Sequence, residues 1–128
     1  MGYLLDTHTL VWWWLGDPAL SHRARALLET GDAAIHISAV AGIEIAQKVR
    51  IGKLPAMAEP LRLFDESVAA EDFRHLPVRH NHAIRAGLMP GEHRDPFDRL
   101  IAAQALIEDL TVVTRDRKIA DFGCKVIW

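Results

Sequence analysis

The chain has 128 residues, of which 50% are apolar, so residues 1–128 are long enough for one compact domain and too short for two. Its 15 basic and 17 acidic residues leave a net charge of -2, which excludes a strongly basic nucleic-acid-binding protein and requires any polyanion to be held by a local basic patch. The single cysteine, Cys124, excludes an internal disulfide framework and fits a reducing compartment.

The apolar periodicity predicts strands and helices in alternation along the chain. In chain order, the first half predicts a strand at 2–5, a helix at 7–14, a helix at 22–30, a strand at 34–37 and a helix at 39–49. The second half predicts a helix at 59–70, a strand at 73–78, helices at 83–88 and 96–109, and strands at 110–114 and 125–127. Ser21, Ser38 and Asp95 are favourable N-caps for three of these helices.

This alternation predicts a single α/β domain with a parallel sheet of four to five strands, covered by helices on both faces. Ligands bind such sheets beyond the carboxyl ends of the strands, where the strand order reverses. We find no signal peptide and no apolar stretch of membrane-spanning length, and we therefore expect a cytoplasmic protein without a membrane partner.

Two acids attract attention in the first half of the chain. Asp6 follows the first predicted strand, although an aspartate there is often only a turn or cap residue. Glu44 is embedded in the apolar part of the helix at 39–49, where an acid has no evident packing role. The alternative for Glu44 is an ion pair with Lys48, four residues further along the helix.

Asp98 lies one turn into the helix that Asp95 and Pro96 open, on the same side as Ile101 and Ala105. Its small and apolar neighbours predict that this side faces the core. The alternative is an acid favoured only by the helix dipole, an effect of about 0.3 to 1 kcal/mol. We assign Asp95 to capping and keep Asp98 as a candidate for chemistry.

The fourth candidate is Asp116, which closely follows the predicted strand at 110–114. Asp121 is the alternative for this role. We prefer Asp116 because the strand delivers it to the same edge of the sheet as Asp6.

Four converging acids would repel one another, by about 4 kcal/mol for each pair at about 4 Å and an effective dielectric constant of about 20. A divalent cation removes this repulsion. An oxygen-only donor set without cysteine or histidine favours Mg²⁺, with Mn²⁺ as an alternative, over Zn²⁺. Such an ion can lower the pKa of water and neutralise charge on a phosphodiester, which predicts hydrolysis without a protein nucleophile.

Four motifs resemble those of the PIN-domain family and follow one another in the same order. They are Leu4-Leu5-Asp6-Thr7, Ser38-Ala-Val-Ala-Gly-Ile-Glu44-Ile, His93-Arg-Asp-Pro-Phe-Asp98-Arg-Leu-Ile-Ala-Ala-Gln and Thr114-Arg-Asp116. Within that family the chain is similar to the VapC-type toxins of bacterial type II toxin–antitoxin systems, and the resemblance spans nearly the whole sequence.

The resemblance implies a PIN-like fold, with Asp6, Glu44, Asp98 and Asp116 as the metal-binding and catalytic acids and Thr114 as a supporting residue. It also implies a Mg²⁺-dependent endoribonuclease, a homodimer, and a cognate antitoxin that covers the active site. We expect Asp6 and Asp98 to ligate the metal, Asp116 to support it, and Glu44 to ligate or to orient the attacking water. In-line attack by water would leave 5′-phosphate and 3′-hydroxyl ends.

Several basic residues lie close in sequence to the acids and are candidates for holding RNA. They are Lys48, Arg50, Lys53, Arg99, Arg115, Arg117 and Lys118. The alternative for each of them is an ordinary solvated surface position.

Three consecutive tryptophans, at residues 12–14, fall on one predicted helix. Successive helix positions point about 100° apart, so we expect at least one tryptophan to be exposed, as a dimer or antitoxin contact. The alternative is that all three pack against neighbouring helices.

Other functions fit the sequence less well. A receiver-like Mg²⁺-binding signalling domain would have paired acids after the first strand, whereas Thr7 follows Asp6; a haloacid-dehalogenase-type phosphatase would have an acid where His8 stands. A DNA-cutting relative stays open, because an acid cluster recognises phosphate and not the sugar. We assign no metal site to the stretch His80-Asn-His82.

Overall fold

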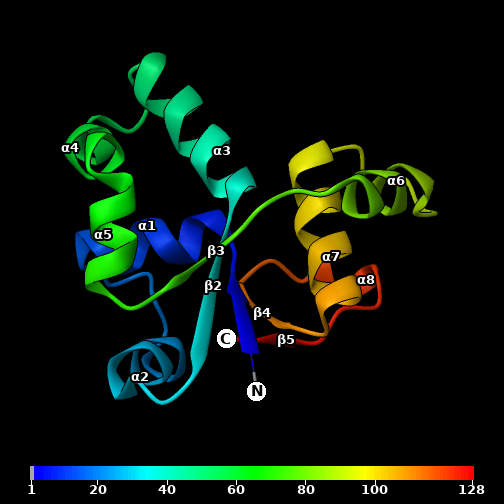
Figure 1. Cartoon of the computed structure of the whole chain (residues 1–128), viewed down its shortest axis with the longest axis horizontal. Coiled ribbons are helices and arrows are strands. Elements are labelled where there is room, and N and C mark those ends of the chain that lie inside the picture. Colours follow the sequence, from blue (N-terminus) through cyan, green and yellow to red (C-terminus); the bar gives the residue numbers. More distant parts are fainter. Residues whose placement is uncertain (1) are drawn as a thin grey trace.

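A five-stranded sheet runs through the middle of the molecule, and all of its neighbouring strands are parallel (Figure 1). The computed structural model describes residues 2–128. The strand order is β3-β2-β1-β4-β5, so β1 lies at the centre. The strands are β1 (Gly2–Leu5), β2 (Ala34–Ser38), β3 (Arg74–Leu76), β4 (Thr111–Val113) and β5 (Val126–Ile127).

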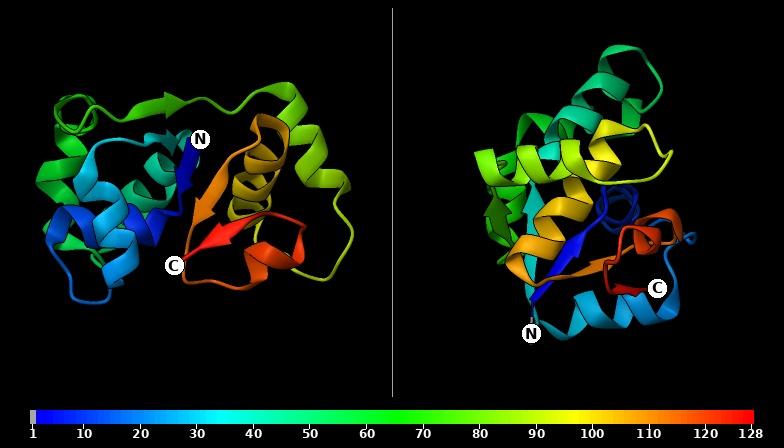
Figure 2. Two further views of the ribbon diagram at one scale, coloured as in Figure 1. Left: turned by 90° about the horizontal axis from the view of Figure 1, so that it is seen from below. Right: turned by 90° about the vertical axis from the view of Figure 1, so that its right-hand side faces the viewer.

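Eight α-helices and one 3₁₀ helix surround the sheet over residues 2–128. In chain order they are α1 (Thr7–Leu15), α2 (His22–Thr30), α3 (Ala39–Arg50), η1 (Pro55–Met57), α4 (Ala58–Arg62), α5 (Phe64–Ala70), α6 (His80–Leu88), α7 (Pro96–Glu108) and α8 (Lys118–Asp121). Helices from the first half of the chain lie on one side of the sheet, and α6 to α8 lie on the other (Figure 2).

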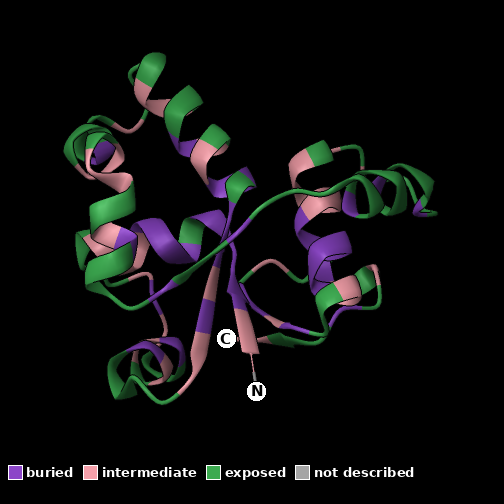
Figure 3. Ribbon diagram, viewed as in Figure 1, coloured by how far each residue is buried: buried purple, intermediate pink, exposed green. Residues whose placement is uncertain are grey.

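Both faces of the sheet are buried, and the strand residues alternate between two apolar clusters. Leu5 and Val113 belong to the cluster beneath α1 and α2, whereas Leu4 and Val112 belong to the cluster beneath α7. Successive strand residues point to opposite faces, so a sheet covered on both sides needs an unbroken apolar run. Figure 3 shows the buried residues gathered along the sheet and on the inner sides of the helices. The predicted α/β fold with helices on both faces is confirmed.

The predicted N-caps of three helices are confirmed. The side chains of Ser21, Ser38 and Asp95 each accept a hydrogen bond from a backbone N–H in the first turn of α2, α3 and α7, at 3.1, 3.0 and 2.9 Å. These caps satisfy backbone donors that would otherwise lack partners. Because β2 leads directly into α3 through Ser38, and β1 leads into α1, both helices begin at the carboxyl edge of the sheet (Figure 1).

The predicted helix at 59–70 is wrong in its continuity. The chain forms two helices, α4 and α5, which are separated by Leu63 at ψ 34°. The N–H of Leu63 bonds the carbonyl of Glu59, and its own carbonyl accepts from Ser67, so this one residue ends α4 and begins α5. Tertiary packing, which the local periodicity does not report, decides such breaks.

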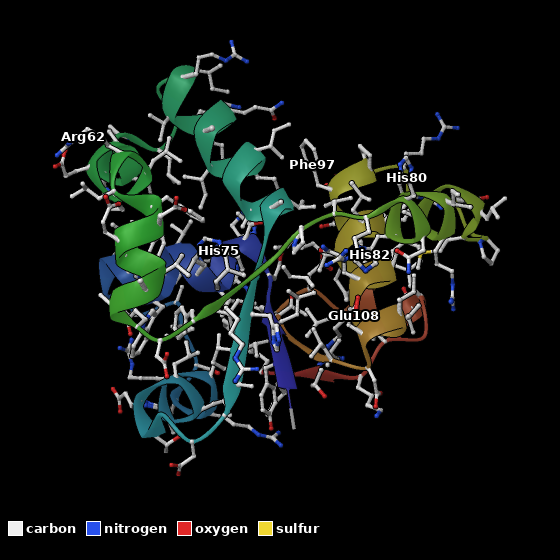
Figure 4. All side chains as sticks on the ribbon, in the orientation of Figure 1. Arg62, His75, His80, His82, Phe97 and Glu108 are labelled. Carbon is white, nitrogen blue, oxygen red and sulfur yellow. The ribbon has the colours of Figure 1, made fainter. Side chains whose placement is uncertain are left out.

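Helix α6 begins at His80, three residues earlier than predicted, because His82 closes its first turn. His82 is fully buried, and its Nδ1 accepts the backbone N–H of Arg79 at 3.0 Å. The proton is therefore on Nε2, which donates to Glu108 of α7 at 3.1 Å (Figure 4). The stretch His80-Asn-His82 thus docks α6 onto α7.

The expectation of an exposed tryptophan in α1 is wrong, because Trp12, Trp13 and Trp14 are all partly buried. Trp14 packs edge-on against Phe64 with ring centroids 5.5 Å apart, and Trp12 packs against Trp128 at 5.8 Å. Segments distant in sequence therefore cover both sides of α1. None of the helices in residues 2–128 combines the length and the apolar character needed to cross a membrane.

Candidate active site

Asp6 lies at the centre of the carboxyl edge of the sheet, where the strand order reverses between β1 and β4. It is only 7% exposed. Its Oδ1 accepts the backbone N–H of Thr7 at 2.7 Å and caps α1, while its Oδ2 accepts the Thr114 hydroxyl at 2.8 Å. Each carboxylate oxygen is therefore held in place by a different residue, and Thr114, the predicted supporting residue, contacts Asp6.

Glu44 extends from α3 toward the same edge. Its Oε1 accepts the hydroxyl of Thr7 at 2.6 Å. Burial raises the pKa of Glu44, the Thr7 hydrogen bond opposes this shift, and the charges of Asp6 and Asp98 raise the pKa further. Among residues 2–128 Glu44 forms no ion pair, and the Nζ of Lys48 lies 3.4 Å from His8 instead. The alternative of a Glu44–Lys48 pair is wrong.

Asp98 occupies the first turn of α7, with a side chain that is 16% exposed. Burial raises the pKa of Asp98, a hydrogen bond from His93 lowers it, and the charges of Asp95 and Asp6 raise it further. The Nε2 of His93 lies 2.7 Å from Oδ2 of Asp98. His93 therefore orients Asp98 as Thr114 orients Asp6.

The charges of Asp6 and Asp98 raise the pKa of Glu44, and the charge of Asp6 raises the pKa of Asp98. Their oxygen-only donor set and uncompensated negative charge suit Mg²⁺ or Mn²⁺. Within residues 2–128, however, no three acid, histidine or cysteine side chains converge tightly enough to hold an ion as they stand. Thr7, Thr114 and His93 hold the acids individually. The residues fit a divalent ion in donor type and charge.

Asp116 lies just beyond β4. Its N–H donates to the Thr114 hydroxyl at 3.0 Å, and its Oδ1 accepts the N–H of Lys118 at 2.9 Å. Asp116 and Asp6 line the same depression, which has a volume of about 350 Å³. Asp121, the alternative fourth acid, is exposed at the end of α8. The geometry therefore favours Asp116.

Three adjoining depressions form a groove across this edge, which we call the basic groove. The central depression is lined by Asp6, His8, Trp12, Arg115 and Asp116. The second, of about 330 Å³, shares His8 and Trp12 with the first and adds Lys48 and Lys53. The third, of about 340 Å³, shares Arg115 and Asp116 and adds Arg23, Arg117 and Trp128.

The predicted RNA contacts divide into three groups. Lys48, Lys53, Arg115 and Arg117 line the basic groove. Arg50 and Lys118 are exposed but do not line any of its three depressions in the part of the chain described.

Arg99 has to be withdrawn from the predicted RNA contacts. Its guanidinium donates four hydrogen bonds, at 2.6 to 3.1 Å, to the carbonyls of His93, Ala86, Met89 and Gly91. These bonds tie the loop between α6 and α7 to α7. A guanidinium occupied in this way is not free to bind a phosphate.

Sequence reasoning missed several residues that the structure places at this edge. They are Thr7, His8, Trp12, Arg23, His93 and Trp128. The motifs that contain Asp6 and Asp98 also contain Thr7 and His93, so their proximity in sequence was the available signal. For Arg23 and Trp128 there was none, because only the fold brings them to β4.

The sequence matches the family model of the PIN domain over residues 3–123. It is 29% identical to Ribonuclease VapC22 of Mycobacterium tuberculosis over 117 residues, which is 91% of this chain and 88% of that protein.

Solved structures share the fold. VapBC2 from Rickettsia felis, bound to a DNA fragment from its promoter, superimposes with a TM-score of 0.73 at 19% identity, covering 99% of this chain and 98% of that chain. A toxin–antitoxin complex from Klebsiella pneumoniae superimposes with a TM-score of 0.67 at 19% identity, covering 99% and 97%. At these identities the likeness establishes the fold alone.

Proposed function

This chain belongs to the PIN-domain family, and from that premise we propose that it is a Mg²⁺-dependent endoribonuclease and the toxin of a toxin–antitoxin pair. The observation that carries the proposal is that Asp6 and Glu44 both accept hydrogen bonds from Thr7 at the point where the strand order reverses, with Asp98 of α7 near enough for its charge to raise the pKa of Glu44. The relative named Ribonuclease VapC22 supports the RNA-cleaving activity. The match to the PIN domain leaves no reason to keep the receiver-like or phosphatase alternatives.

We assign each acid a chemical role according to its surroundings. Asp6 and Asp98 would ligate the ion, because Thr114 and His93 already fix one oxygen of each. When bound, Mg²⁺ supplies charge neutralisation at the phosphodiester and lowers the pKa of water. Glu44, whose pKa burial raises, would orient the attacking water and accept its proton. Asp116 would support the ion from the end of β4.

An antitoxin partner is supported by two of the similar structures, VapBC2 of Rickettsia felis and the toxin–antitoxin complex of Klebsiella pneumoniae. We propose that a cognate antitoxin covers this edge of the sheet and that the free protein is a cytoplasmic homodimer. Light scattering after gel filtration checks the dimer: we expect about twice the 14.3 kDa of one chain, and a mass near 14.3 kDa contradicts it.

The test of the activity is RNA cleavage by the native protein, Asp6→Asn and Asp98→Asn, each with Mg²⁺ and with EDTA. Asp65→Asn is the matched control, because Asp65 has an 88% exposed side chain on α5. We expect cleavage only by the native protein and the control, only with Mg²⁺, and with 5′-phosphate and 3′-hydroxyl ends.

Persistent cleavage by both folded active-site variants would overturn the site. A 2′,3′-cyclic phosphate product would overturn attack by water. A parallel incubation with DNA of the same sequence tests the DNA-cutting alternative, which gains support only if DNA is cut and RNA is not.

A further inference from the structure

The basic groove concentrates positive charge in a protein whose net charge is -2. Its two outer depressions carry cations from four separate segments of the chain. These cations are Arg23, Lys48, Lys53, Arg115 and Arg117. The acids Asp6 and Asp116 lie in the central depression, so cations flank the acids on both sides. A polyanion drawn along the groove would therefore present a phosphate at the acids.

Trp12 lies where the central depression meets the one that contains Lys48 and Lys53. Its ring is partly buried, and the guanidinium of Arg115 lies 4.7 Å from a ring centroid. The ring centroids of His8 and Trp128 lie 5.6 and 5.8 Å from the ring centroid of Trp12. Trp12 thus lines two of the groove's depressions, beside His8, Arg115 and Trp128.

The distance from Trp12 to the acids suits a nucleotide next to the cleaved bond. Asp6 caps α1, and six residues of helix at about 1.5 Å each separate Asp6 from Trp12 by about 9 Å along the axis. Every base has a π-face, so an aromatic ring at this distance can hold a base without regard to its identity.

We propose that Trp12, with Arg115, is a stacking platform for the unpaired base adjacent to the cleaved phosphate. This inference rests on the proposed nuclease function. A base within a duplex is stacked and paired on its own strand and cannot lie on Trp12. The platform favours unpaired RNA through stacking, and the cations hold its backbone.

The test measures binding without cleavage, in Asp98→Asn protein, by the fluorescence anisotropy of a labelled single-stranded oligoribonucleotide. Adding Trp12→Leu should weaken binding by about 5- to 150-fold, the range for loss of one stacked base. Trp12→Phe should keep most of the affinity. Trp14→Leu is the matched control, because Trp14 is on the same helix and equally half-buried but packs on Phe64.

A second arm keeps Trp12 and changes the RNA, so it does not depend on the folding of a variant. Removing the bases around the expected cut should weaken binding by a similar factor, and should abolish the difference between Trp12 and Trp12→Leu. The same strand annealed to its complement should bind more weakly than the single strand.

Unchanged affinity in Trp12→Leu, equal binding of the abasic strand, or equal binding of the duplex each overturns the platform. Loss of antitoxin binding in Trp12→Leu with unchanged RNA affinity would assign the groove to a protein partner and also overturn it. Because these are binding measurements, such results leave RNA cleavage by the native protein intact and are distinguishable from failure of the nuclease proposal.

Discussion

Two polar regions that include residues of α7 differ in how their polar groups are paired. One is the acid cluster of Asp6, Glu44 and Asp98, in which burial and neighbouring acids raise the pKa of Glu44 and Asp98. The other, which we call the interior network, contains Arg99 and Gln104. Gln104 is fully buried; it accepts a hydrogen bond from the Ser38 hydroxyl at 2.5 Å and donates to the carbonyls of Leu76 and Pro77 at the end of β3.

The comparison separates structural from functional polarity. In the interior network the side chains donate to carbonyl and amide oxygens, which is how buried polar groups stabilise a fold. In the acid cluster negative charges lie near one another. Their repulsion disfavours the folded state, and a bound cation would relieve it. Burial of a polar side chain alone is therefore a poor marker of function, whereas unresolved like charge is a good one.

The largest expected effect is on the rate of RNA cleavage. Glu44→Gln should reduce RNA cleavage by more than about 100-fold, because losing a group at the site exceeds the effect of losing an outer partner. The amide oxygen of the substituted side chain can still accept the Thr7 hydroxyl, so the fold should persist, as circular dichroism can check. Initial rates within about threefold of the native protein would place Glu44 outside the machinery, and Glu66→Gln on exposed α5 is the control.

Substitution of Arg99 and of Arg115 should change the free energy of unfolding by different amounts. Arg99→Met removes the donors for four carbonyls and should lower the free energy of unfolding by about 3 kcal/mol or more. Arg115→Met should change it by no more than about 0.5 kcal/mol, because Arg115 is exposed. Urea unfolding measures both variants, and equal losses would remove the distinction drawn between them.

A smaller effect is expected where a neutral partner supports an acid. Thr114→Val removes the hydroxyl that donates to Asp6, and should reduce cleavage by about 10-fold. Thr114→Ser, which keeps the hydroxyl, should restore most of the rate. If valine and serine give the same rate, the hydrogen bond has no part in orienting Asp6.

The smallest expected effect is on stability, and here the active-site variant should be more stable than the native protein. Since the pKa of Asp98 is raised in the folded protein, its ionisation destabilises the metal-free fold at pH 7. Asp98→Asn should therefore stabilise the protein in EDTA, by at most about 1 kcal/mol because solvent screens a half-buried charge. The gain should vanish as the pH falls below 3.8, the ordinary pKa of an aspartate. Thermal unfolding across pH tests this, and destabilisation at pH 7 would contradict it.

Much of the fold could be predicted because its signals are local. Short apolar runs between the helices predicted the strands, and Ser21, Ser38 and Asp95 marked the starts of their helices. The break at Leu63 could not be predicted, because it depends on how α4 and α5 pack. Helix α8 was missed because four residues are too few to show a period.

The candidate site was predictable only in its acids. An acid in an apolar helix, such as Glu44, contradicts its surroundings and is visible in sequence. An arginine, by contrast, fits its sequence context whatever its role is. Arg99 and Arg115 cannot be distinguished in the sequence, and only the fold shows that Arg99 bonds to carbonyls whereas Arg115 lies over Trp12. Residues that support an acid from a distant segment, as Thr114 supports Asp6, become identifiable only through the fold or a family resemblance.

The central claim is that Asp6 and Asp98 ligate one divalent ion, and titration calorimetry with Mn²⁺ at pH 7 tests it most directly. The account predicts binding by the native protein, unchanged binding by Asp65→Asn, and affinity weakened at least about 10-fold in each of Asp6→Asn and Asp98→Asn. Native-like Mn²⁺ affinity in both of these variants, or no binding by the native protein, would contradict it.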